Sequence, residues 1–145
     1  MRKELFVTTC AVTFLLGVVS TLAVMQWTQR IENVARIKVI GVGIYKDINF
    51  TVAVTQIDWG IVEPGESKNF SAYIVNLSNI PIKLSMTTED WHPANASNSI
   101  TLTWSYTGDE IAVDGYHFVT FVLTADQAVS GIDAFSFTIV VIGSG

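Results

Sequence analysis

Hydrophobic and polar positions divide the chain into one long apolar run followed by a series of short alternating segments. Residues 5–25 read LFVTTCAVTFLLGVVSTLAVM and carry no charged side chain. A run of this length is long enough to cross a bilayer as a helix. Further along, apolar and polar residues alternate at the two-residue period of a β-strand with one buried face. The pattern predicts a membrane-spanning helix followed by a β-domain.

The alternation is clearest over residues 99–106, where every second side chain is apolar. Similar segments give about seven strands, separated by turns rich in Gly, Asn, Asp and Pro. Their spacing of about 8–12 residues is that of an immunoglobulin-like antiparallel β-sandwich. A parallel α/β sheet is excluded, because no amphipathic helix is available for its crossovers. The strands are expected at residues 37–45, 51–57, 68–77, 82–88, 99–106, 116–125 and 135–141.

The chain is predicted to be a single-pass protein of the cell membrane. Arg2 and Lys3 precede the apolar run, and positive flanks stay in the cytoplasm, so the C-terminal domain is extracytoplasmic. Cleavage after Ala23 is the alternative, but the apolar run is longer than the usual signal-peptide core. The expected parts are a cytoplasmic tip (1–4), a transmembrane signal-anchor helix (5–25), a linker that could form a helical stalk as far as Ala35 (26–36) and a β-sandwich domain (37–145).

Several short motifs predict turns and packing. Pro64-Gly65 suits the two central positions of a type II turn, and Trp59 is expected to plug the core beneath it. The asparagines and the proline of residues 76–81 predict a corner between strands. Gly41 and Gly43 indicate a bulge or a close approach of backbone. Among the tryptophans, Trp91 is the candidate surface aromatic.

Residues suited to catalysis are few. His92 and His117 have no Cys or second His at ligand spacing, and Cys10, the single cysteine, lies in the apolar run. Two acidic pairs, at 89–90 and 109–110, could bind calcium together with Asp114, but they lack the regular spacing of a dedicated calcium loop. We therefore predict a protein that is not an enzyme, with no catalytic residue, no metal site and no cofactor.

The exported part is acidic and carries possible modification sites. The net charge is −5 and no Lys or Arg follows Lys83, so nucleic acid is excluded as a partner, whereas a basic partner is compatible. The plainer interpretation of this charge is a solvated, soluble surface. Four Asn-x-Ser/Thr sequons are candidates for N-glycosylation, at Asn49, Asn69, Asn76 and Asn95.

Five short motifs give the chain a resemblance to a known group. They are Gly43-Ile44-Tyr45, Ile57-Asp58-Trp59-Gly60 with Pro64-Gly65, Tyr73-Ile74-Val75-Asn76, Trp91-His92-Pro93 and Leu102-Thr103-Trp104. Together they resemble a group of uncharacterised archaeal surface proteins with one membrane helix and one immunoglobulin-like domain. The resemblance implies the fold and a location on the cell envelope, and it carries no activity.

Two functions fit these features. The first is a membrane-anchored module that binds or scaffolds another envelope component, expected to be a protein, with self-association left open. The second is a structural subunit of an extracellular filament, in which residues 37–45 leave their own sheet and complete a neighbour's edge. The first is favoured, because Arg2-Lys3-Glu4 lacks the glycine of a prepilin processing site.

Overall fold

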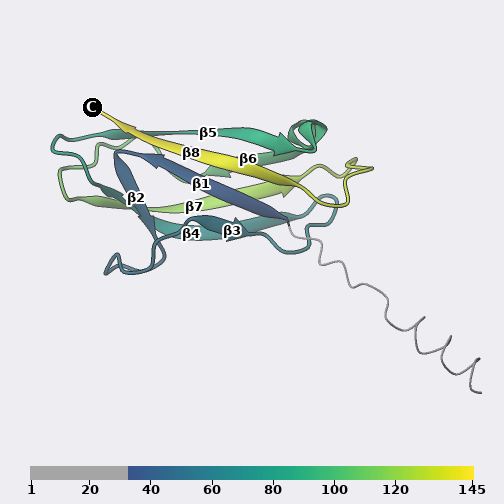
Figure 1. The fold of residues 1–145 in the computed structure, drawn as a ribbon, viewed down its shortest axis with the longest axis horizontal. Helices are drawn as coiled ribbons and strands as arrows, with labels where there is room; N and C mark the ends of the chain where they lie inside the picture. Colours follow the sequence, from purple (N-terminus) through teal and green to yellow (C-terminus); the bar gives the residue numbers. More distant parts are fainter. Residues whose placement is uncertain (1–32) are drawn as a thin grey trace, which may run out of the picture. The chain divides into compact units, whose positions relative to one another are not determined.

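The alternating segments of the chain build two four-stranded β-sheets that pack face to face (Figure 1). The first sheet has the order β3-β1-β8-β5 and the second has the order β2-β4-β7-β6. The all-β prediction is thus confirmed at the level of two sheets. The elements are β1 (Val34–Ile40), β2 (Val42–Tyr45), β3 (Gln56–Asp58), β4 (Ser67–Asn76), β5 (Lys83–His92), the 3-10 helix η1 (Ala94–Asn98), β6 (Ile100–Trp104), β7 (Tyr116–Ala125) and β8 (Ser136–Ser144).

The computed structural model describes residues 33–145. The predicted cytoplasmic tip, the predicted membrane helix and most of the predicted linker lie outside these residues. Within residues 33–145, no helix is long and apolar enough to cross a membrane. The first strand begins at Val34, so a helical stalk reaching Ala35 is wrong at its end. Ala35 is fully buried and pairs with Ile57 and Phe137, and this packing places it in the sheet.

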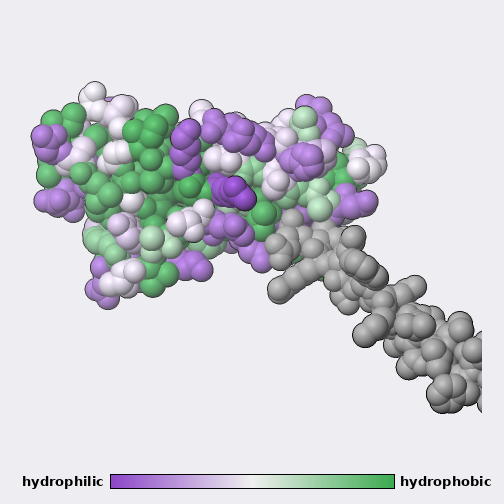
Figure 2. All heavy atoms as spheres, viewed as in Figure 1, coloured by the Kyte–Doolittle hydropathy of each residue, from purple (hydrophilic) through white to green (hydrophobic). Residues whose placement is uncertain are grey.

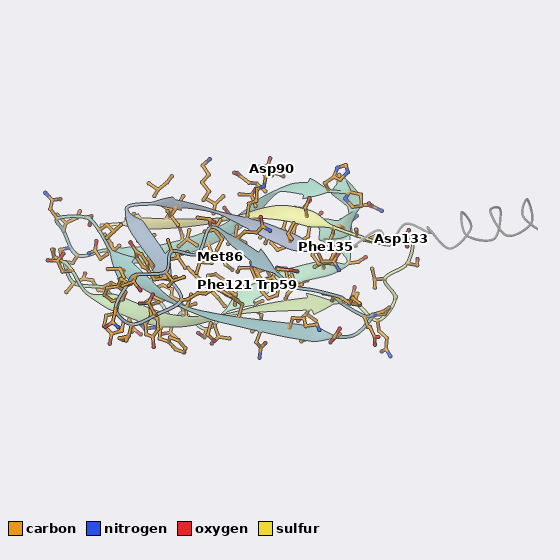
Figure 3. The ribbon with its side chains drawn as sticks, turned by 60° about the horizontal axis from the view of Figure 1, so that its bottom comes forward. Trp59, Met86, Asp90, Phe121, Asp133 and Phe135 are labelled. Atoms are coloured by element: carbon orange, nitrogen blue, oxygen red, sulfur yellow. The ribbon has the colours of Figure 1, made fainter. Side chains whose placement is uncertain are left out.

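The core lies between the two sheets, where the apolar residues of each strand point inward. Figure 3 shows Trp59, Met86 and Phe121 directed into this space, whereas Asp90 points outward. The predicted alternation is confirmed in β7, where Phe121 and Leu123 are fully buried and the residues between them are not. Trp59 is 5% exposed, as expected for a residue that plugs the core.

The predicted strand at 37–45 is wrong as one element, because Gly41 divides it. At this glycine φ is +74°, a left-handed conformation that costs little without a Cβ. The chain turns there from β1 in the first sheet to β2 in the second. The predicted strand at 51–57 is also wrong over most of its length, because β3 includes only its last two residues and ends at Asp58.

One strand pairing differs from the predicted antiparallel arrangement. β1 and β8 run parallel over seven paired positions, from Val34 opposite Ser136 to Ile40 opposite Ile142. The other five pairings are antiparallel. We call the end of the sandwich where β1 begins the near end, and the end where β1 and β8 finish the far end.

Two buried asparagines fix the two ends of the sandwich. At the near end, the Asn33 side chain donates to the Gly60 carbonyl at 2.9 Å and accepts from the Phe135 amide at 3.1 Å. At the far end, Asn76 Nδ2 lies within 3.1 Å of the Ile80, Ile111 and Ala112 carbonyl oxygens. Asn76 Oδ1 also accepts from the Ser78 amide and hydroxyl. This network confirms the predicted corner at residues 76–81.

The turn at Pro64-Gly65 is confirmed as well. Gly65 has φ +77°, and the Glu66 amide donates to the Glu63 carbonyl across the turn at 3.0 Å. A positive φ at the third turn residue after a proline is the geometry of a type II turn. The reversal leads the chain directly into β4.

Replacing Asn76 with alanine should destabilise the domain strongly. The substitution removes the hydrogen bonds that Asn76 Nδ2 donates to carbonyl groups of two loops and those that its Oδ1 accepts from Ser78, at a cost of about 2 kcal/mol or more in the free energy of unfolding. Chemical denaturation of the full-length protein in detergent measures this loss. Asn95→Ala is the control, because Asn95 is exposed in η1, and it should change stability by less than about 0.5 kcal/mol. Equal stabilities of the two variants would contradict the role given to Asn76.

Candidate functional site

The outer face of the second sheet has no charged side chain, and we call it the uncharged face. Solvated surfaces of soluble domains carry charge on about 25–35% of their residues, so this composition is unusual. The inward positions of the same strands fill the core, as at Ile44, Ile74 and Phe121. The outward residues are Gly43, Tyr45, Ser67, Asn69, Ser71, Tyr73, Val75, Thr101, Thr103, Tyr116, Phe118, Thr120, Val122 and Thr124.

Five aromatic rings gather on the half of this face nearer the far end. Tyr73 lies at the centre, with its ring centroid 4.9 Å from that of Phe118 and 5.7 Å from that of Tyr116. Phe50 covers the group, 5.7 Å from Tyr45 and 5.6 Å from Tyr116. Most of these pairs are tilted or edge-on, the arrangements that aromatic quadrupoles favour. We call these five residues the aromatic cluster.

The cluster is open to solvent. Tyr116 is 49% exposed and Phe118 is 52% exposed, although both stand on a central strand of the sheet. Large side chains in such positions lose the free energy that burial would provide. Exposed apolar groups that form one contiguous patch mark surfaces that bind something.

Gly43 on β2 has no side chain, and this leaves space for the ring of Tyr45. A Cβ built on Gly43 would lie 2.6 Å from Cε2 of Tyr45, closer than such atoms approach. The Tyr45 ring therefore lies over the bare backbone of Gly43. The predicted close approach of backbone is wrong at Gly43, because the Tyr45 side chain makes the approach.

The loop after β2 carries Phe50 and is held by Asp47. The Asp47 carboxylate accepts from the Thr51 hydroxyl at 2.6 Å and from the Val52 amide at 2.8 Å. The hydrogen bond from the Thr51 hydroxyl is the main cause that lowers the pKa of Asp47 from its ordinary value of 3.8. Phe50 adopts a φ of +56° inside this loop, a conformation that is uncommon for a residue with a Cβ.

The other half of the uncharged face is a row of hydroxyl groups on β4 and β7. Ser71 Oγ lies 2.8 Å from Thr120 Oγ1, and Ser67 Oγ lies 3.0 Å from Thr124 Oγ1. Asn69 stands between the two serines on the same side of β4. Each hydroxyl keeps spare donor or acceptor capacity after its single cross-strand bond. We call this half the hydroxyl row.

The outer face of the first sheet has different chemistry. Arg36 and Lys38 on β1 and Lys83 on β5 point outward there together with Glu89, which lies 3.7 Å from Lys38. A hollow of about 300 Å³ beside the bulge in β5 is lined by Arg36, Asp90 and Thr138. Arg36 and Asp90 are exposed, so the hollow has no buried polar group that would fix a ligand.

Further exposed aliphatic side chains lie at the far end, next to the aromatic cluster. Figure 2 shows hydrophobic residues gathered toward the end at which β1 and β8 finish. They come from the end of β1 and from two far-end loops: Val39, Ile40, Leu77, Ile80 and Val113, each between 40% and 60% exposed.

The four predicted sequons differ in how far their asparagines are exposed. Asn49, Asn69 and Asn95 are exposed and stay candidates for N-glycosylation. Asn76 is wrong as a candidate, because it is 0% exposed and its amide nitrogen, the atom that would carry a glycan, is surrounded by carbonyl oxygens. Its sequon arises from the corner that the asparagine stabilises.

The remaining candidates are not brought together. Trp91 is wrong as a surface aromatic, because its ring stacks on Phe137 at 4.2 Å and its Nε1 donates to Thr88. His117 points inward, edge-on to the Tyr106 ring. Within the part of the chain that the structure describes, no three His, Cys, Asp or Glu side chains could hold a metal ion together. The acidic pairs that were considered for calcium therefore form no candidate site here.

Sequence reasoning missed the aromatic cluster. Its members come from β2, β4, β7 and the loop after β2, and only the pairing of these strands brings them together. One signal was available in β7, where Tyr116 and Phe118 occupy the positions that alternate with the inward Val119 and Phe121. Large aromatic residues on the solvent side of a strand were the available sign of an exposed aromatic patch.

Comparisons with protein-family models and with curated proteins find no match for the chain. The uncharged face is therefore the main basis for a functional argument.

The hydrogen bonds of Asp47 should make the packing of Phe50 depend on pH. Because the folded-state pKa is lowered, the stabilisation is complete above the unfolded value of 3.8 and is lost as the pH falls through the folded-state value. We expect the contact between Phe50 and Tyr116 to weaken as the pH falls below the ordinary carboxyl value of 3.8 and the Asp47 carboxylate becomes protonated. NMR chemical shifts of both rings measure this.

Asp47→Asn is the matched variant for this prediction. The amide cannot accept at both oxygen positions, so the contact should already be weak at neutral pH and should not change on acidification. A wild-type loop that stays unchanged when the Asp47 carboxylate is protonated would contradict the role of this carboxylate.

Proposed function

We propose that the chain is a non-catalytic cell-surface module with an immunoglobulin-like β-sandwich, anchored to the membrane by residues 5–25. It binds or scaffolds another component of the cell envelope through the uncharged face. The observation that carries the proposal is the exposure of Tyr116 and Phe118, two rings of the aromatic cluster that stand on a central strand and have no structural need to be exposed. The apolar run and its positive flank support the anchor and the outward orientation. The exposed sequons fit a glycosylated surface domain.

A filament subunit built by strand donation is the second candidate. The strand that would be donated is β1, an interior strand of the first sheet. It lies between β3 and β8, so a copy that donates β1 elsewhere would leave β3 without a partner and one side of β8 open. In the described chain, β1 fills its own sheet and Ala35 is buried there. Deleting β1 would destabilise either kind of protein, so a different test is needed.

Substituting two exposed rings tests the proposed function. The double variant Tyr116→Ser with Phe118→Ser should fold normally, because about half of each side chain is already in water. We expect mild detergent to release this variant from native envelopes at least about tenfold more readily than the wild type, since hot-spot aromatics dominate the affinity of an interface.

Ile40→Ser with Ile61→Ser is the matched control for this experiment. It removes two apolar side chains that are 51% and 74% exposed and lie outside the uncharged face. The control should be retained as well as the wild type. Equal retention of all three proteins would refute binding through the uncharged face.

Chemical cross-linking separates the two candidates. Lys38 on β1 and Glu89 on β5 lie 3.7 Å apart across β8, close enough for a carbodiimide to join them. A chain that keeps its own β1 should form this link internally and stay a monomer on a denaturing gel. A ladder of covalent oligomers that disappears in Lys38→Gln would instead establish strand donation.

A further inference from the structure

The uncharged face has a chemistry that restricts its ligand. Nucleic acids, anionic lipids and acidic glycans are bound by Lys and Arg, and this face has none. A protein partner of ordinary type would require an apolar centre with a polar, charged rim. Here the aromatic cluster is continued by the hydroxyl row, which has a single apolar side chain, Val122. The surface is neutral, and along β4 and β7 it changes from aromatic side chains to hydroxyl groups.

A neutral saccharide has the complementary chemistry. Sugar rings present C–H groups on their faces, and these pack against the electron-rich faces and the edges of aromatic rings. Their rims carry hydroxyl groups, which exchange hydrogen bonds with Ser, Thr, Tyr and Asn side chains. Because neither partner is charged, binding does not require the desolvation of a charged group. The cluster and the row would act on the same ligand.

The geometry of the face suits an extended ligand. The aromatic cluster and the hydroxyl row follow one another along β4 and β7, from Tyr116 to Thr124 in β7. At about 3.4 Å per residue, these positions span about 27 Å, which is room for several sugar rings in a row. The cross-strand bonds from Ser71 to Thr120 and from Ser67 to Thr124 hold the side chains of the row in place.

We propose that the uncharged face binds a neutral glycan chain carried by another envelope component, with aromatic stacking at the Tyr73, Tyr116 and Phe118 end and hydrogen bonding along the row at Ser71 and Thr120. The inference rests on the proposed function and names the ligand class of the same face. Asn69 stands within the row, so a glycan attached there would compete for the site.

The test uses full-length protein in nanodiscs of neutral phosphatidylcholine, made in a host without N-glycosylation so that Asn69 is unmodified. The probes are hexasaccharides of glucose, of mannose and of N-acetylglucosamine, and hexagalacturonate is the anionic control. Saturation-transfer NMR at about 10 mM ligand detects binding with millimolar dissociation constants. At least one neutral hexasaccharide should bind, and it should bind more tightly than hexagalacturonate.

Two sets of variants locate the site. Tyr116→Ser with Phe118→Ser should weaken binding about tenfold or more through lost stacking. Ser71→Ala with Thr120→Val should weaken it several-fold through lost hydrogen bonds, whereas an apolar protein partner would be held as well or better. The control Ile40→Ser with Ile61→Ser should bind like the wild type.

The absence of binding by all the neutral probes, or binding that both face variants leave unchanged, overturns the inference. The proposed function fails separately, through the retention experiment. If the Tyr116 and Phe118 variant loses its retention in the envelope while no saccharide binds, the face binds a protein, and only the saccharide inference falls.

Discussion

The parallel pairing of β1 with β8 is the interaction on which the rest of the sandwich depends. β1 stands between β8 and β3, and β3 has no other neighbour in the sheet. The pairing extends over the whole length of β1, and it brings the first strand of the domain beside the last. Because β1 ends at the far end, Gly41 can turn the chain into the second sheet there. β2 then runs along β4 and places Tyr45 beside Tyr73. The position of the aromatic cluster thus depends on the pairing of β1 with β8 and on the turn at Gly41 that follows β1.

The two outer faces differ in charge, and the proposed function divides solubility and binding between the two sheets. The first sheet carries its charges outward, and these favour water and discourage unwanted association. The outer face of the second sheet has none, so the solubility of the domain depends on the first sheet and on the acidic loops. A rigid sheet also holds the rings of Tyr73 and Phe118 in fixed positions, which reduces the entropy lost when a ligand binds. The proposed binding face lies on strands and differs from the common arrangement, in which loops carry the binding residues.

Much of the fold followed from local sequence, and the exceptions have physical reasons. Strand positions in β5 to β8 could be predicted because alternation reports directly which side of a strand is buried. The break at Gly41 could not, since the β-branched residues on both sides of the glycine favour one continuous strand. Residues 51 and 52 were mistaken for the start of a strand, because they belong to a loop whose structure depends on one carboxylate, that of Asp47, and not on a repeating pattern. The parallel β1–β8 pair joins residues about a hundred positions apart, and strand composition does not encode such partners.

The candidate site was predicted less well than the fold, and for a related reason. A motif such as the Asn76 sequon is recognised from consecutive residues alone, whereas its exposure depends on the fold, which buries Asn76. The aromatic cluster has no motif at all, because it is assembled by register: Tyr45 opposite Tyr73, and Tyr73 opposite Phe118. The alternation of the sequence indicates only which side of a strand faces away from the core. On that side polar residues are expected, so the informative residues were the aromatic ones.

An uncharged, shallow face suits weak and repeated contacts better than a single tight one. Stacking and neutral hydrogen bonds each contribute little in water, because both partners are solvated before they meet. Modules tethered to one membrane, as proposed, would meet a repeating envelope polymer at a high effective concentration, and several weak contacts then add up to firm attachment. Such attachment would still allow individual modules to release and rebind as the envelope grows. Charged recognition would be tighter for each contact, but it would also attract every ion of opposite sign at the cell surface. Neutral chemistry avoids that competition, and under the proposed function this is the reason why the outer face of the second sheet lacks charge.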